Sequence, residues 1–249
     1  MIKLGKTICV FSVKGGIGKT TTVLNLAGIY STMNLKTLII DLNLDNGGIA
    51  FSLNKKTKKT IYNLLNDMDN KKYTNISDYV SNYNYNIDIV ASPNNLVEKF
   101  KINNKYINLL LYDIKNKYDV ILIDTSSALS ELNLMLLDKS DKVLFMVSND
   151  PVCLNSSRKI ISIFKENEID NYKILYNASR DTSLSHFTLF DVKTILKKNV
   201  NYTISKNFYI KNIDSYIMDG KIITLNRKIQ SSKKKDYKNI SNMATDLLK

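Results

Sequence analysis

The segment "FSVKGGIGKTTT" (Phe11–Thr22) places three glycines between two lysines and ends in threonines. Glycines allow a tight turn that brings backbone N–H groups close to phosphate oxygens. Lys19 is placed to reach the β- and γ-phosphates of a nucleotide, and the Thr20 hydroxyl is placed to complete a Mg²⁺ shell. The usual spacing asks for a glycine where Val13 stands, and it does not ask for Lys14. We therefore predict a phosphate-binding loop of altered form.

The neighbouring elements support this interpretation, because a predicted strand precedes the loop and a predicted helix follows it. The amino end of that helix carries a partial positive charge, which favours a bound phosphate. A simple glycine turn with two chance lysines is the alternative. The predicted nucleotide-binding residues are Gly15, Gly16, Ile17, Gly18, Lys19, Thr20 and Thr21.

A second polar position follows the apolar run in "DVILIDTSS" (Asp119–Ser127). An aspartate at the end of such a strand is suited to holding Mg²⁺ through water. A strand-ending aspartate is weak evidence alone, but it gains weight after a phosphate-binding loop. We predict that Asp124 is a metal-binding residue.

Short apolar runs recur along the chain, with helical patterns between them, as in a sheet whose strands are buried on both faces. This alternation predicts an α/β fold with a doubly wound, mostly parallel sheet, helices on both faces and one domain over residues 1–249. Ligands then bind at the carboxyl ends of the strands. The predicted strands are Lys6–Val13, Lys36–Leu42, Ile87–Ala91, Asp119–Asp124, Lys142–Ser148, Tyr172–Asn177 and, more weakly, Tyr202–Ser205. The predicted helices are Thr20–Met33, Thr60–Asp67, Asn103–Lys117, Glu131–Lys139, Leu154–Asn167 and Thr188–Lys198, and the polar stretch Asp67–Asn86 reads as a surface excursion.

The chain carries 36 basic and 23 acidic residues, a net charge of +13. A polyanionic partner, nucleic acid or membrane, is one interpretation. Compositional drift is favoured instead, because the basic residues are spread along the chain. We find no signal peptide and no apolar run of the roughly 20 residues that span a bilayer. Cys9 and Cys153 read as reduced core thiols, and His186 has no partner ligand nearby, so we expect a cytoplasmic protein.

The order K-G-G-x-G-K-T in this loop resembles the deviant phosphate loop of the ParA/MinD superfamily of P-loop ATPases, and the likeness extends from about Lys6 to the carboxyl end. The resemblance implies that Lys14 reaches across an ATP-dependent homodimer to the partner's nucleotide. It also implies that Asp41 helps to organise Mg²⁺ and the attacking water, with Asn43 in place of a second carboxylate. Asn177 would bind the adenine, with a strand-end turn asparagine as the alternative. The implied catalytic residues are Lys14, Lys19, Asp41 and Asn43, and the metal ligands are Thr20, Asp41 and Asp124.

Two further segments resemble the CpaE/TadZ branch, whose members localise pilus assembly: "LDNGGIAFSL" (Leu44–Leu53) and the stretch from Ser185 to Phe208. The family usually continues after the Asp124 position with two prolines and a glycine, where this chain has Thr125-Ser126-Ser127-Ala128. We expect a slow ATPase that uses ATP and Mg²⁺ to position a pilus or secretion machine or a DNA cargo. The alternatives are a partition ATPase that binds DNA non-specifically, an ATP-binding module with little turnover, and a metabolic P-loop enzyme.

The carboxyl-terminal segment bears on whether the protein binds a membrane or DNA. In "DYKNISNMATDLLK" one helical face carries Ile240, Met243, Ala244, Leu247 and Leu248, which predicts packing on the domain's own core rather than a membrane anchor. A candidate DNA-binding cluster precedes and overlaps it, although a solvated loop is the favoured interpretation. The cluster comprises Arg227, Lys228, Lys233, Lys234, Lys235 and Lys238.

Overall fold

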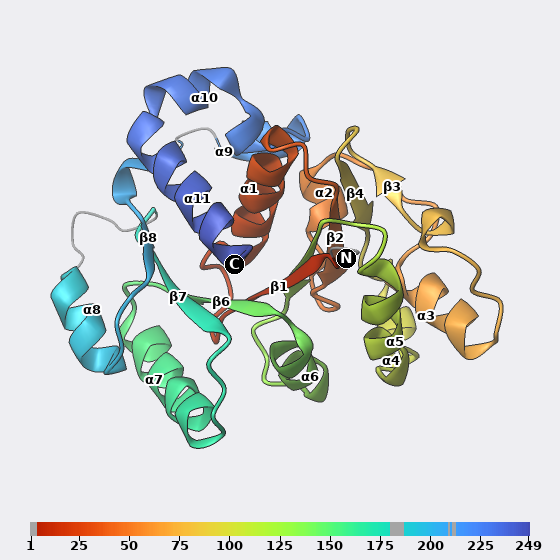
Figure 1. The fold of residues 1–249 in the computed structure, drawn as a ribbon, viewed down its shortest axis with the longest axis horizontal. Helices are drawn as coiled ribbons and strands as arrows, with labels where there is room; N and C mark the ends of the chain where they lie inside the picture. Colours follow the sequence, from red (N-terminus) through yellow and green to blue (C-terminus); the bar gives the residue numbers. More distant parts are fainter. Residues whose placement is uncertain (1–3, 180–186, 209, 211–212) are drawn as a thin grey trace.

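The computed structural model describes residues 4–179, 187–208, 210 and 213–249. Within these residues the strands form one eight-stranded sheet in the order β3-β4-β2-β5-β1-β6-β7-β8 (Figure 1). Neighbouring strands pair in parallel except β3 with β4, which is antiparallel. The strands are β1 (Lys6–Phe11), β2 (Thr37–Leu42), β3 (Ser81–Asn82), β4 (Ile87–Val90), β5 (Val120–Thr125), β6 (Lys142–Val147), β7 (Tyr172–Asn177) and β8 (Tyr202–Ile204).

Helices cover both faces of the sheet (Figure 1). One face carries α1 (Lys19–Thr32), α2 (Ile49–Ser52), α9 (Ile213–Met218), α10 (Arg227–Ser232) and α11 (Lys234–Leu247). The other carries α3 (Ile61–Asp69), α4 (Leu96–Phe100), α5 (Lys105–Ile114), α6 (Glu131–Lys139), α7 (Pro151–Glu166) and α8 (Leu189–Leu196). Single 3₁₀ turns occur at Ile76–Asp78, Lys206–Phe208 and Ile223–Leu225.

Every residue of β2 and β5 is buried, because side chains that point to either face of the sheet meet a helix layer. Separate hydrophobic clusters lie on the two faces. β1 lies at the centre of the sheet, and the chain leaves it toward β2 on one side and later returns to β6 on the other. The carboxyl end of β1 is therefore a topological switch point, where such folds bind ligands.

The predicted doubly wound sheet is confirmed, and the bounds of β7 and α6 agree with the sequence prediction. The polar stretch Asp67–Asn86 contains the end of α3, a 3₁₀ turn and the short edge strand β3, which the sequence pattern did not reveal. The helices α2, α4, α9 and α10 were also missed, since each is only four to six residues long. His186 lies outside the described residues.

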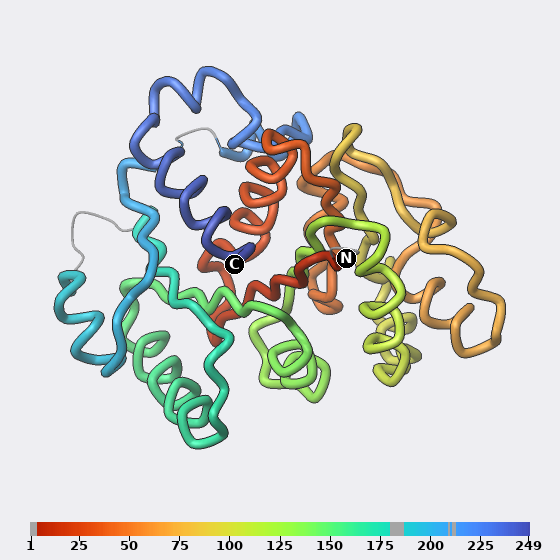
Figure 2. The backbone as a smooth tube through the Cα atoms, in the orientation of Figure 1, coloured from red at the N-terminus to blue at the C-terminus, as the bar shows by residue number. Residues whose placement is uncertain are grey.

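The carboxyl-terminal helix packs on the core as predicted. Ile240, Met243, Ala244 and Leu247 are at most 2% exposed, and the Tyr30 hydroxyl of α1 donates to the Ala244 carbonyl at 2.9 Å. Figure 2 shows this blue segment returning beside the orange-red α1. No helix among the described residues has the length and apolar character to cross a bilayer.

The basic cluster near the carboxyl end lies on helices rather than on the predicted loop. Arg227 and Lys228 begin α10, and Lys234, Lys235 and Lys238 lie on α11. These five side chains are exposed. Lys233 joins the two helices, and its ammonium donates to the Asn207 carbonyl. The loop prediction was wrong because the capping side chain of Asn226, which accepts from Lys228 N and Ile229 N, starts a helix that hydrophobic periodicity does not show.

Candidate nucleotide-binding site

The glycine-rich loop connects β1 to α1 at the switch point of the sheet. Gly16 and Gly18 have φ angles of +75° and +96°, which side chains with a Cβ rarely adopt. A Cβ on Gly18 would also come within 2.9 Å of the Asn177 amide nitrogen. The loop therefore requires glycine at these positions. Ile17, between them, is only 7% exposed and packs into the core beneath the loop.

Lys19 is the first residue of α1, directly after the phosphate-binding loop, and its side chain is buried. Its ammonium donates to Ser12 Oγ at 3.1 Å, and the Ser12 hydroxyl donates to the Lys14 carbonyl at 2.7 Å. Burial lowers the pKa of Lys19, while the charge of Asp124 opposes that shift. The only acceptor that the described residues offer the Lys19 ammonium is this neutral hydroxyl, so a bound phosphate would stabilise its charge. Ser12 is a part of this site that sequence reasoning missed.

The structure brings Thr20 and Asp124, the residues that the sequence suggests as metal ligands, into direct contact. The Thr20 hydroxyl donates to Asp124 Oδ2 at 2.6 Å, whereas Asp124 Oδ1 is buried and has no hydrogen-bond partner among the described residues. Asp41 of β2 is the register partner of Asp124. Burial raises the pKa of both carboxyl groups, and the charge of Asp41 raises the pKa of Asp124 further. Two neighbouring buried carboxyl groups with an unsatisfied oxygen are suited to a divalent cation.

Magnesium fits this donor set, because it prefers oxygen ligands and usually binds one or two carboxylates together with water and substrate phosphates. The described residues contain no cluster of three or more His, Cys, Asp or Glu side chains placed to bind a metal. A cation here would therefore be shared between the Thr20 hydroxyl, Asp124 and the nucleotide.

Unlike Asp124, Asp41 accepts hydrogen bonds from backbone amides at both of its carboxylate oxygens. Oδ1 accepts from the Asn43 amide at 3.1 Å, and Oδ2 accepts from the Ile49 amide at 3.0 Å. The carboxylate thus fixes the loop between β2 and α2. Gly47 belongs to that loop and lies against Ser92, because a Cβ on Gly47 would fall 1.4 Å from the Ser92 hydroxyl.

An open polar pocket of about 360 Å³ lies above these groups. Asn43 reaches it from the loop after β2, and the serine-rich segment Ser126–Ala128 after β5 forms a wall. The predicted Mg²⁺ ligands Asp41 and Asp124 lie below the pocket, fully buried. The lining residues are Gly15, Gly16, Gly18, Lys19, Thr20, Thr21, Asn43, Asp45, Asn46, Ser126, Ser127 and Ala128.

Asn177 lies on the other side of the loop, in a smaller and mostly apolar pocket of about 50 Å³. Its amide donates to the Ile17 carbonyl at 2.8 Å, and its oxygen accepts from the Ser179 amide at 3.1 Å. Asn177 therefore anchors the loop to the end of β7. The apolar side chains here come from Ile204, Phe208, Ile210, Ile213 and Ile223.

Lys14 does not line the pocket of its own subunit. Its ammonium lies 2.7 Å from Asp150 Oδ2, with the Lys14 side chain 45% exposed. Asp150 also caps α7 by accepting from the Cys153 amide at 2.7 Å. The hydrogen bond from Lys14 and the capping bond hold the pKa of Asp150 below its ordinary value. Sequence reasoning did not identify Asp150, since it lies 136 positions after Lys14 in the sequence.

Comparisons with known proteins agree with this geometry. A family model described as an AAA domain matches residues 5–175. The chromosome-partitioning ATPase Soj of Treponema pallidum is 25% identical over 221 residues, which cover 86% of this chain and 83% of that protein. A ParA family ATPase from Chlorobium tepidum has a similar fold, with a TM-score of 0.81 at 17% identity over 98% of both chains. The septum site-determining protein MinD of Pyrococcus horikoshii, complexed with Mg-ADP, gives 0.79 at 18% identity over 98% of this chain and 96% of that one. The chain therefore belongs to the ParA/MinD family of ATPases.

Proposed function

We propose that this protein is an ATP-dependent switch that dimerises around nucleotide, hydrolyses it slowly and thereby positions a cellular cargo. The orientation of Lys14 carries the proposal. Lys19 lies inside its own site, whereas Lys14 points out of it and remains partly exposed. A phosphate-loop lysine in that position is available to the nucleotide of a second subunit.

The energetics favour such a transfer. An exposed ion pair such as Lys14–Asp150 contributes about 0–1 kcal/mol, so breaking it costs little. A positive side chain supplied in trans to a transferring phosphoryl group contributes on the order of 10³ to 10⁵ in rate. ATP, with its additional phosphate, would then stabilise the dimer more than ADP does.

The chemistry within each site follows from the residues described above. Lys19 and the loop amides would bind the phosphates, and Thr20 and Asp124 would hold Mg²⁺, which neutralises charge on the phosphates. Asn43 lines the pocket, and its carboxamide can orient a water molecule but cannot act as a base. Slow turnover is the expected result.

DNA is the cargo that we favour. The Treponema relative is named as a chromosome-partitioning ATPase. Five exposed basic residues lie together on α10 and α11, and two copies would be joined in a dimer. Each phosphate that is neutralised strengthens non-specific binding. Placement of a pilus or secretion machine, in the cytoplasm, is the second candidate, and the segment Leu44–Leu53 with its likeness to the CpaE/TadZ branch supports it.

Sedimentation with a non-hydrolysable ATP analogue tests the dimer. Lys19→Ala should lose nucleotide binding, whereas Lys14→Ala should bind the analogue as a monomer and fail to dimerise. Asp150→Asn is the matched control, because asparagine keeps the cap on α7 and removes only the charge that pairs with Lys14. That variant should dimerise at lower protein concentration. A Lys14→Ala protein that still dimerises contradicts the proposal.

A mobility-shift assay at physiological salt tests the cargo. DNA binding should require ATP, be indifferent to sequence and weaken steeply with salt, with each contact adding about −0.9 to the slope of log K against log salt. Replacing Lys228, Lys234 and Lys235 by Ala should make that slope shallower. Replacing the exposed Lys56, Lys71 and Lys72 removes the same charge elsewhere and should leave the slope unchanged. Absence of ATP-dependent DNA binding would instead favour machine placement.

A further inference from the structure

A buried side chain of α6 fixes the wall of the phosphate pocket. Asn133 is 1% exposed. Its amide nitrogen donates to the Ser126 carbonyl at 3.3 Å, the Ser126 hydroxyl at 3.0 Å and the Ala128 carbonyl at 2.6 Å. All three acceptors belong to the segment Ser126–Ala128, which follows β5 and lines the pocket. One carboxamide thus fixes the path of the whole segment.

The amide has two hydrogens for these three acceptors, so at least one is shared. Asn133 Oδ1 meanwhile is buried and has no partner in the part of the chain that the structure describes. An unsatisfied buried oxygen is costly, so simple packing would be served better by an apolar side chain of similar size. The donors of Asn133 are the part of this side chain that the structure uses.

The hydroxyls of the segment are left free to act as donors. The Ser126 hydroxyl accepts from Asn133, and its own hydrogen therefore remains available. Ser127 is half-buried and makes no hydrogen bond within the described residues. A Cβ on Gly15 would lie 3.7 Å from Ser127 Oγ, which places that hydroxyl against the start of the phosphate-binding loop. Lys19 and Thr20 lie at the other end of the loop.

We propose that Asn133 is a positioning residue that holds Ser126–Ala128 so that the Ser127 hydroxyl donates to the terminal phosphate of a nucleoside triphosphate. The segment would then distinguish a triphosphate from a diphosphate, which does not extend to that wall. The inference rests on the proposed function, since it requires that the pocket binds nucleoside phosphates.

The test compares affinities for ADP and for a non-hydrolysable ATP analogue by titration calorimetry. Asn133→Asp keeps the shape of the side chain but replaces its donors by acceptors facing three oxygens. We expect its affinity for the analogue to fall about tenfold or more, as for loss of a hydrogen bond to a charged group, with ADP affinity within about twofold of wild type. Ser127→Ala, which alters no buried contact, should show the same selective loss.

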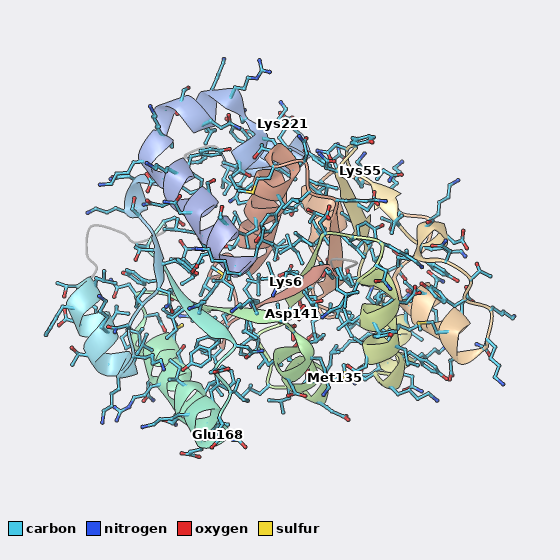
Figure 3. The ribbon with its side chains drawn as sticks, viewed as in Figure 1. Lys6, Lys55, Met135, Asp141, Glu168 and Lys221 are labelled. Carbon is cyan, nitrogen blue, oxygen red and sulfur yellow. The ribbon has the colours of Figure 1, made fainter. Side chains whose placement is uncertain are left out.

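Asn171 offers a matched control. Its amide donates in the same way to the carbonyls of Leu137 and Ser140, and its buried oxygen likewise has no partner among the residues described. Asn171 immediately precedes the amino end of β7, and its contact with Ser140 puts it beside the start of β6, where Figure 3 labels Asp141. The phosphate pocket lies at the opposite, carboxyl ends of the strands. Asn171→Asp should lower thermal stability and leave the ratio of the two affinities unchanged.

The outcomes separate this inference from the function on which it rests. Equal loss of both nucleotides in Asn133→Asp and an unchanged ratio in Ser127→Ala would overturn the positioning role alone. The same change of ratio in Asn171→Asp would also overturn it, because the effect would then be one of general stability. A wild-type protein that binds neither nucleotide would overturn the proposed function as well.

Discussion

The loops after β2 and β5 leave the sheet side by side, each from a buried aspartate, yet they are held in opposite ways. Asp41 and Asp124 are register partners. After β2, the carboxylate of Asp41 itself binds the loop through the amides of Asn43 and Ile49. After β5, the side chain of Asn133 binds the loop, and one oxygen of Asp124 has no hydrogen-bond partner within the described part of the chain.

This difference indicates separate roles for Asp41 and Asp124, although both stand near the carboxyl end of a buried strand. Hydrogen bonds from backbone amides already satisfy the charge of Asp41, as they lower its pKa against the larger effect of burial. Asp124 has fewer such bonds and feels the charge of Asp41. A cation therefore gains more at Asp124. We expect Asp41 to organise its loop and Asp124 to bind the metal.

The largest effect should follow Asp124→Asn. A bound Mg²⁺ contributes several kcal/mol to charge stabilisation on phosphates, so Mg²⁺-dependent ATP affinity should fall by about a hundredfold or more. Titration calorimetry with and without Mg²⁺ measures this loss. Asp41→Asn, the paired control, should retain most of the Mg²⁺ dependence, and equal losses in the two variants would remove the distinction between the loops.

Asp124→Asn should also be more stable than wild type in the absence of nucleotide. Burial and Asp41 raise the folded-state pKa of Asp124 above its unfolded value. Such a group favours folding fully only below the unfolded pKa, and that contribution is lost as pH rises through the folded pKa. The difference in Tm between Asp124→Asn and wild type should therefore grow from pH 5 to pH 8 in calorimetry. A difference that shrinks over this range would contradict the assignment.

The second effect concerns the loop after β2. Hydrogen bonds to a charged group contribute about 1.5–3 kcal/mol, which corresponds to roughly tenfold to a hundredfold in an opening equilibrium. Asp41→Asn should accelerate hydrogen exchange at the Asn43 and Ile49 amides by about that factor. Exchange in Ser126–Ala128 should not change, because Asn133 holds that segment. Faster exchange in both loops would mean that they open together.

Much of this architecture could be predicted from the sequence, because its signals are local. Strands with apolar runs on both faces, a glycine loop and an aspartate at a strand end are each visible within about ten residues. The contacts that hold these loops in place are not visible in this way. Asn133 meets Ser126 only because α6 folds back over the loop, and Asp150 meets Lys14 from 136 positions further along the chain. No sequence pattern around Asn133 or Asp150 indicates which residue its side chain contacts.

A third effect tests whether the loop after β2 can carry a second carboxylate. Asn43 lines the pocket, so Asn43→Asp would place an acid–base group beside the phosphates. A positioned group of this kind contributes about 10² to 10⁴-fold, but an amide that already orients water reduces the gain. We expect the single-turnover rate to rise roughly tenfold to a hundredfold. An unchanged or lower rate would show that repulsion from Asp41, two residues away, outweighs the gain.

The smallest effect concerns Asp45, the other carboxylate in the loop after β2. Asp45 lines the pocket, but its side chain is paired with Lys99 of α4, and both partners are partly exposed. Exposed pairs contribute about 0–1 kcal/mol, so Lys99→Ala should lower the free energy of unfolding by no more than that in urea titrations. The single-turnover rate should stay within about twofold, because freeing Asp45 does not move it to the place of Asn43. A rate increase in Lys99→Ala that disappears in the double variant with Asp45→Asn would show instead that Asp45 acts on the nucleotide once Lys99 releases it.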